Sequence, residues 1–217
     1  MSTNVSRNDD TRTRILAAAE HLFAVRGFDG TSIREITRVA GVNVAAVHYH
    51  FGSKEAVLRG VTDRVARPIS VRRAQLLEAA VEAAGTETPG LETLLDAFVR
   101  ADVEILLELQ ERGPWVARFL GRTYGDQTAW IQEMAREQYA QGEEFFPLLA
   151  AALPDLSADE IAWRISRVVA VIVHLFATWP EEGLSVEDAE VLVNRLVAFL
   201  AGGLRAPLPA TADQTGR

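Results

Sequence analysis

Apolar residues recur at helical spacing along almost the whole chain, and the strict alternation that marks β-strands is nearly absent. Residues 11–26 show the pattern clearly, with Ile15, Ala19, Leu22 and Phe23 on one stripe. Further helices are predicted over residues 32–39, 44–50, 54–84, 91–111, 115–123, 127–152, 158–178 and 186–202. Clusters of glycine and proline separate these segments. The predicted fold class is therefore all-α.

Two of the shortest predicted helices lie on either side of a glycine turn. Ser32 and Glu35 have the spacing of a capping box, which begins the helix over residues 32–39. Gly41 then interrupts the chain, and Asn43 and Ser53 are suitable N-caps for the next two helices. Two short helices joined by a tight glycine turn are typical of the helix-turn-helix motif.

Charge is distributed unevenly along the 217 residues, whose formal net charge is −8. The first sixty residues hold eight basic and six acidic side chains, whereas the remainder holds fourteen and twenty-four. Because nucleic acid repels an acidic surface, any DNA contact is expected within the first sixty residues.

Composition also limits the other classes of function. The chain has no cysteine and four scattered histidines, so no metal site or other cofactor is expected. No apolar run is long enough to span a bilayer, and the start MSTNVSRNDD lacks the apolar region of a signal peptide. We therefore expect a soluble cytoplasmic protein without membrane contact.

Three spaced motifs agree with one known family. They are Gly27-Phe28-Asp29-Gly30-Thr31-Ser32, Val39-Ala40-Gly41-Val42 and Val47-His48-Tyr49-His50-Phe51-Gly52-Ser53-Lys54. In these stretches the chain resembles the N-terminal domain of the TetR family of bacterial transcription regulators. The resemblance implies a helix-turn-helix DNA-binding domain over residues 11–58 and a larger helical ligand-binding and dimerisation domain over 59–203. Residues 1–10 are expected to form a disordered arm, and residues 204–217 a flexible tail.

Contacts with double-stranded operator DNA are expected from the second half of this region. Tyr49 offers a hydroxyl and a flat ring to a phosphate and sugar, and Lys54 lies at a helix N-terminus, which also favours phosphate. The resemblance places Val44 and His48 toward base edges and Arg34 near the groove, although a solvated arginine is the alternative for Arg34. The other predicted DNA-contacting residues are Thr31, Ser32, Asn43, Ala45, Ala46 and His50.

The last two helices have apolar faces wider than the single stripe that a monomer surface requires. This width predicts burial against a second copy in a homodimer, with full burial inside one chain as the alternative. The predicted interface residues are Val169, Val173, Leu192, Leu196 and Phe199.

Aromatic and polar residues gather between positions 115 and 146, and we expect a small-molecule effector to bind there. The predicted ligand-binding residues are Trp115, Phe119, Arg122, Tyr124 and His174. Arg122 and Tyr124 would orient an anionic or hydroxylated ligand. Most of the aromatic residues, and His174, also fit an ordinary core.

The resulting hypothesis is a transcription regulator, most simply a repressor that a small molecule releases from its operator. The first alternative is a regulator without a small-molecule effector, controlled by a protein partner or acting as an activator. A helical enzyme is a remote alternative, because the sequence contains no nucleophile elbow, phosphate loop or metal-ligand spacing.

Overall fold

The computed structural model describes residues 2–113, 115–140 and 145–208, and its regular structure in these ranges is helical, as predicted. The N-terminal part contains α1 (Ser2–Arg26), α2 (Ile33–Ala40), α3 (Val44–His50) and α4 (Lys54–Ala84). The helices that follow are α5 (Leu91–Leu109), the short 3₁₀ helix η1 (Gln110–Arg112), α6 (Trp115–Gly125), α7 (Ala129–Ala140), α8 (Phe145–Ala151), α9 (Ala158–Ala177) and α10 (Val186–Leu204).

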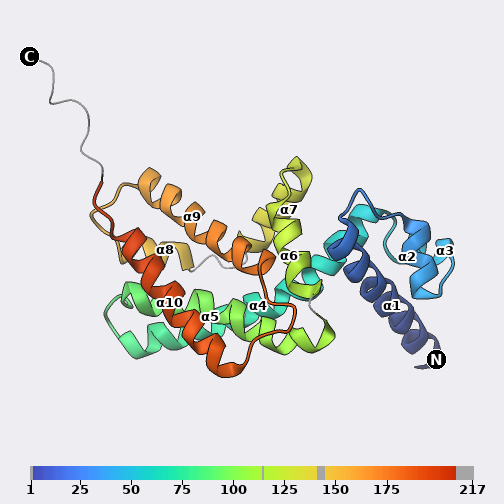
Figure 1. The fold of residues 1–217 in the computed structure, drawn as a ribbon, viewed down its shortest axis with the longest axis horizontal. Helices are drawn as coiled ribbons and strands as arrows, with labels where there is room; N and C mark the ends of the chain where they lie inside the picture. The colour runs from blue at the N-terminus through green and yellow to red at the C-terminus, as the bar shows by residue number, and fades with distance from the viewer. Residues whose placement is uncertain (1, 114, 141–144, 209–217) are drawn as a thin grey trace, which may run out of the picture.

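The helices form two groups that α4 connects (Figure 1). At one end, α1 packs against α2, α3 and the start of α4. At the other end, α5 packs between α4 and α10, and α8 lies against α5 and α9. Helix α6 occupies the middle, where it contacts both α1 and α9. The buried apolar side chains of both groups form one continuous core.

Helices α2, α3, α4 and α9 begin where the sequence predicted because polar side chains satisfy their first N–H groups. The Ser32 hydroxyl accepts a hydrogen bond from the Glu35 N–H, and the reciprocal half of the capping box is also present. Asn43 and Ser53 cap α3 and α4 in the same way. At Ser157 the hydroxyl accepts from the Glu160 N–H at the start of α9.

Two predicted element boundaries need correction. Helix α1 begins at Ser2, so residues 2–10 continue the helix instead of forming a disordered arm; the Asp10–Arg14 pair, one turn apart, supports the extension. The single helix predicted over 127–152 is described as α7 and α8, which pack against different neighbours. The expected domain boundary at residue 58 lies within helix α4 and stays a prediction. Most of the predicted tail lies outside the described residues.

A search of the described helices for one long and apolar enough to cross a bilayer finds none.

Helices α6 and α9 approach each other closely where they cross at Gly121. A Cβ atom added at Gly121 would lie 2.5 Å from the Ala177 nitrogen and 2.7 Å from its Cα atom. These distances are shorter than any side chain tolerates, and the neighbouring atoms belong to the backbone, which cannot rotate away. The absence of a side chain at Gly121 therefore allows the two backbones to touch and fixes the position of α6.

We predict that Gly121→Ala lowers the free energy of unfolding by about 1–3 kcal/mol, because the added methyl group forces α6 and α9 apart. Gly125→Ala on the same helix is the control, since its Cβ would meet Val173 Cγ1 at an ordinary 3.9 Å. Urea unfolding followed by circular dichroism measures both variants. Equal stability of Gly121→Ala and the natural chain would show that the helices can separate freely.

Candidate nucleic-acid interface and ligand pocket

Helices α2 and α3 are joined by a turn that needs glycine. Gly41 adopts the left-handed conformation with φ 65° and ψ 38°, and its N–H reaches back to the carbonyl groups that end α2. The Asn43 side chain then accepts from the Ala46 N–H at 2.8 Å. Ile36 and Val47 are completely buried, one from each helix, so the pair is held as a unit on α1.

This packing leaves the opposite face of α3 open to solvent. Val44 is 40 % exposed and Tyr49 is 77 % exposed, and Ala45 and His48 also lie at the surface. Arg34 on α2 is exposed as well. Large exposed apolar and aromatic side chains on a short, well-anchored helix are the arrangement that base-edge and sugar contacts require. The predicted base-contacting residues therefore share an accessible surface, apart from Ala46, which is partly buried.

The structure gives other roles to the predicted phosphate ligands Thr31 and Lys54. Thr31 is 2 % exposed, and its hydroxyl donates to the Gly27 carbonyl at 2.8 Å. The Lys54 ammonium donates to the carbonyls of Phe28 and Thr31 at 3.0 and 3.1 Å, and lies 4.0 Å from the centre of the Phe28 ring. Because the loop after α1 leaves these carbonyl oxygens without helical partners, the two side chains hold the loop instead of facing a phosphate.

Three further predicted DNA contacts lie at helix ends. Ser32 is exposed, but its hydroxyl is engaged with Glu35 in the capping box. Asn43 is exposed and caps α3. His50 is partly buried and packs edge-on against Tyr49, at 5.2 Å between ring centres. These residues shape the ends of α2 and α3, and their contact with DNA stays a prediction.

The sequence analysis did not identify Arg14 of α1, which hydrogen-bonds to the turn between α2 and α3. Its Nη2 atom donates to the carbonyls of Ala40 and Gly41 at 2.5 and 2.9 Å. The sequence contains no local signal for this contact, because an exposed arginine on a long helix has many alternatives.

The helix-turn-helix group contacts the rest of the chain through α1, which packs against α6 and Arg112. Arg122 of α6 donates to the Ala24 carbonyl at 3.1 Å, and Trp115 packs edge-on against His21 at 4.9 Å. Arg112 pairs with Glu20, whose side chain is 3 % exposed. Burial raises the pKa of Glu20, and the charges of Arg112 and Arg64 only partly offset that effect.

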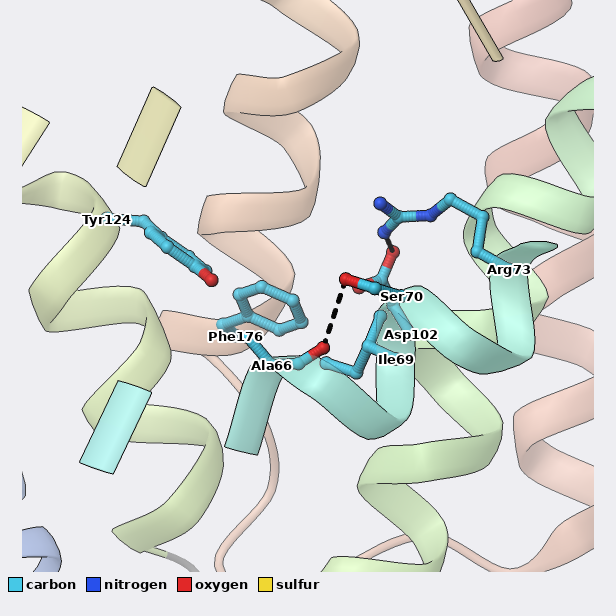
Figure 2. A pocket seen from close by; sticks show the side chains of 7 residues that line it. All are labelled: Ala66, Ile69, Ser70, Arg73, Asp102, Tyr124 and Phe176. Carbon is cyan, nitrogen blue, oxygen red and sulfur yellow. Dashed lines mark hydrogen bonds and ion pairs between the residues drawn. The ribbon is translucent and has the colours of Figure 1, made fainter. Parts of the chain in front are cut away.

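A pocket opens between α4, α5, α6 and α9 (Figure 2). The space that it encloses is about 20 Å³, far below the range of about 300–1,000 Å³ that is usual for ligand sites. It is lined by Ala66, Ile69, Ser70, Arg73, Asp102, Tyr124 and Phe176.

Of the five predicted ligand-binding residues, Tyr124 lines this pocket. Trp115 and Arg122 face α1, as described above. Phe119 is completely buried in the core, and His174 is exposed on α9. The ligand-binding role of this set stays a prediction.

The polar end of the pocket is a buried ion pair that sequence reasoning missed. Arg73 Nη2 donates to Asp102 Oδ2 at 3.0 Å, and the two side chains are 7 % and 2 % exposed. The Arg73 guanidinium also lies 4.0 Å from the centre of the Phe98 ring. Burial raises the pKa of Asp102 to about 6, because desolvation of the carboxylate outweighs the attraction of Arg73.

The described residues of one chain leave the outer faces of α9 and α10 uncovered. Phe199 is 69 % exposed, and Val169, Val173, Leu192 and Leu196 are partly exposed. Trp163 and Val191 extend the same kind of surface, at 56 % and 53 % exposure. A second copy covering these helices is compatible with this exposure, and the dimer stays a prediction.

Comparison with known proteins agrees with this architecture. Residues 15–61 match the family described as bacterial regulatory proteins of the tetR family, and residues 96–203 match the tetracyclin repressor-like C-terminal domain. The HTH-type transcriptional repressor Rv3405c of Mycobacterium tuberculosis is 28 % identical over 181 residues, covering 76 % of this chain and 90 % of that protein.

Two solved structures are similar over most of their length. SCO3833 from Streptomyces coelicolor, a member of the TetR transcriptional regulator family, has a TM-score of 0.56 and 27 % identity, covering 88 % of this chain and 91 % of that chain. The TetR family regulator PfmR from Thermus thermophilus has a TM-score of 0.57 and 20 % identity, covering 90 % and 96 %.

Removing the Lys54 ammonium should destabilise the fold. We predict that Lys54→Met lowers the free energy of unfolding by about 1–3 kcal/mol, because the Thr31 carbonyl loses the ammonium donor and the Phe28 carbonyl keeps only the Thr31 N–H. Arg34→Ala, at an exposed position, should stay within about 0.5 kcal/mol of the natural chain. Thermal unfolding measures the stability of both variants. A Lys54→Met protein of full stability whose DNA binding is weaker and less salt-dependent would restore the phosphate role.

Asp102 should give the stability a distinctive pH dependence. Its folded pKa, about 6, lies above the ordinary value of 3.8, so the native state binds its proton more tightly than the unfolded state. The resulting stabilisation is complete below about pH 4 and is lost as the pH rises to about 6, a change of up to about 3 kcal/mol.

The natural chain is compared with Asp102→Asn by urea unfolding at a series of pH values. Subtracting the two curves removes the contributions of the other carboxylates. The natural chain should lose stability relative to the variant as the pH rises from about 4 to 6. A relative gain over the same interval would mean that Arg73 stabilises the carboxylate more than burial destabilises it.

Proposed function

The chain belongs to the TetR family of bacterial regulatory proteins, and from this premise we propose that it is a repressor released from its operator by a small molecule. The family consists of DNA-binding transcription regulators, so the chain is a regulator and not an enzyme. The proposal also assigns DNA binding, ligand binding and dimerisation to separate parts of the chain. We assign DNA binding to the helix-turn-helix over 11–58, and ligand binding and dimerisation to residues 59–203.

One observation carries the ligand-release mechanism: α6 touches both the DNA-binding group and the pocket. Its Arg122 donates to the Ala24 carbonyl of α1, and its Tyr124 lines the pocket one half-turn later. Helix α4 makes a second connection, because it begins at the helix-turn-helix and carries Ala66, Ile69 and Arg73 into the pocket. A ligand that shifts either helix changes the position of α3, and with it the population of DNA-competent molecules.

Two copies would bind one operator, because recognition helices of a symmetric dimer enter successive major grooves about 34–36 Å apart. The exposed apolar faces of α9 and α10 support this assembly. Their closing partner is then a second identical chain, related by a two-fold axis. Since its target is chromosomal DNA, the working location of such a regulator is the cytoplasm.

DNA binding is tested by selection of duplexes from a random pool with the full chain, followed by fluorescence anisotropy on the enriched sequence. Arg34→Ala and His48→Ala should each weaken binding to that sequence by about 1–3 kcal/mol and relax specificity at single base pairs. Tyr49→Phe should weaken specific and non-specific binding equally. Absence of any enriched sequence, or unchanged affinity in all three variants, would contradict the assignment of α3.

Release of DNA by a ligand is tested on a DNA fragment that carries the enriched sequence. A compound that raises the melting temperature in a library screen should also lower DNA affinity, with a coupling of about 1–3 kcal/mol. Stabilising compounds that leave the DNA affinity unchanged would favour a regulator controlled by other means.

The dimer is tested by light scattering at micromolar concentration. A charge in the centre of the interface, as in Leu196→Glu, should produce a monomer, because an unpaired carboxylate cannot be buried at small cost. Arg38→Glu, at an exposed position on α2 away from α9 and α10, is the control and should leave the assembly intact. A natural chain that is monomeric under these conditions would exclude the proposed interface.

A further inference from the structure

The exposed side of α3 carries apolar groups where a DNA-reading helix often carries arginine, asparagine or glutamine. Its sequence is VAAVHYH, which contains none of these residues and no lysine. Val44 is 40 % exposed, and Ala45 is exposed beside it. Helix α3 lies at the outer end of the molecule, away from α9 and α10 (Figure 1). Much of what this helix offers to a major groove is therefore methyl groups.

Three side chains of α3 can form hydrogen bonds, and they occupy different surroundings. Tyr49 is assigned above to a sugar and phosphate, and His50 is partly buried against the Tyr49 ring. His48 is exposed and lies one helical turn after Val44, so the two side chains share a face of α3. His48 is thus the hydrogen-bonding side chain of α3 that is best placed for the edge of a base.

A contact within the chain fixes which nitrogen of the His48 ring carries the proton. The Nδ1 atom lies 3.1 Å from the carbonyl oxygen of Gly52. A carbonyl oxygen can only accept, so Nδ1 is the donor in this hydrogen bond. In a neutral imidazole one nitrogen donates and the other accepts, so Nε2 has a lone pair and no proton. The exposed ring therefore offers DNA an acceptor.

An acceptor distinguishes the base pairs of a major groove. Adenine presents the N6 amine and cytosine the N4 amine, and both are donors. Guanine presents N7 and O6, which are acceptors and would face the Nε2 lone pair unfavourably. A phosphate oxygen is also an acceptor, so the same nitrogen is unsuited to the DNA backbone.

The polar residues next to α3 do not take over this role. The Asn43 amide oxygen accepts from the Ala46 N–H at 2.8 Å, so the amide cannot turn to form a bidentate contact with adenine without uncapping α3. Arg34 and Arg38 are exposed on α2, and a guanidinium has donors only. Recognition of guanine by a side chain therefore belongs to α2, and α3 is left with methyl groups and one acceptor.

We propose that α3 reads thymine methyl groups through Val44 and Ala45, and an exocyclic amine of adenine or cytosine through His48 Nε2. This inference rests on the proposed assignment of DNA binding to α3, and it does not depend on ligand release. Thymine carries the methyl group of the major groove, which an exposed valine can cover without burying a polar group. Since Val44 and His48 are one turn apart, the thymine and the amine belong to neighbouring base pairs.

The experiment measures the affinity of the full chain for the enriched duplex after replacement of single nucleotides. Deoxyuridine in place of thymidine removes the methyl group and keeps the hydrogen-bonding groups. Purine in place of adenine, or pyrimidin-2-one in place of cytosine, removes the exocyclic amine. The same replacements outside the half-sites are the control for duplex stability.

Two losses of affinity are expected in each half-site. At least one deoxyuridine should weaken binding about fourfold, which corresponds to about 0.8 kcal/mol for one buried carbon group. Removal of one amine should weaken binding roughly two- to tenfold, as expected for one hydrogen bond.

Variants assign each loss to a side chain. The deoxyuridine effect should shrink in Val44→Ala and persist in Val81→Ala, a matched control on α4 whose valine is 39 % exposed. The effect of removing the amine should vanish in His48→Ala. His48→Arg replaces the acceptor by donors, so its preference at that base pair should change to guanine.

Nuclear magnetic resonance of the nitrogen-15-labelled chain without DNA tests the premise independently. The nitrogen shifts of the neutral His48 ring should show the proton on Nδ1. A ring that carries it on Nε2 would offer a donor and overturn the inference.

The DNA measurements distinguish failure of the inference from failure of the proposed function. An enriched sequence that tolerates every deoxyuridine, or every removal of an amine, would overturn the inference and leave DNA binding intact. Losses that persist unchanged in Val44→Ala and His48→Ala would do the same. Failure to enrich any sequence would contradict the assignment of DNA binding to α3, and the inference with it.

Discussion

The contact between α6 and α9 at Gly121 is the constraint on which the other features depend. Two helices can approach backbone to backbone only where one of them has no side chain, and a Cβ at Gly121 would overlap with Ala177. This contact holds α6 against the C-terminal core. From that position α6 reaches α1 through Arg122 and the pocket through Tyr124. Helix α6, which is held in place by its contact with α9, thus connects the pocket to the DNA-binding group.

The buried polar groups lie along the same route. Glu20 and Arg112 join α1 to the segment before α6, and Arg73 and Asp102 join α4 to α5. Neither pair is needed for a hydrophobic core of this size, and buried ion pairs are seldom more stabilising than apolar side chains. Their value is orientation, since each pair fixes the angle between two helices that the hydrophobic effect alone leaves adjustable.

Local features of the fold were predictable from sequence, and partners distant in the chain were not. Ser32, Asn43 and Ser53 cap helices because their partners lie three residues away. Lys54 was assigned to phosphate because nothing near it reveals that the loop carbonyls of Phe28 and Thr31 turn toward its ammonium. Asp102 lies at helical spacing between apolar residues such as Phe98 and Ile105, which indicates burial, but this spacing does not reveal that Arg73 of another helix is its partner. Helical periodicity left Val44 and His48 of α3 ambiguous, and the family resemblance placed them toward DNA. The ligand-binding set stays a prediction, because aromatic residues serve cores and pockets alike.

The most direct test of the account is the separation of the two DNA-binding groups within a dimer. The chain has no cysteine, so Arg38→Cys at an exposed position of α2 allows one spin label to be attached to each copy. The distance between the two labels is then measured by pulsed electron paramagnetic resonance. On the selected DNA fragment the distance distribution should be narrow and fit half-sites about 34–36 Å apart. A compound that releases the DNA should move or broaden this distribution in the absence of DNA. Release with an unchanged distribution would contradict the claim that α4 and α6 transmit pocket occupancy to α3.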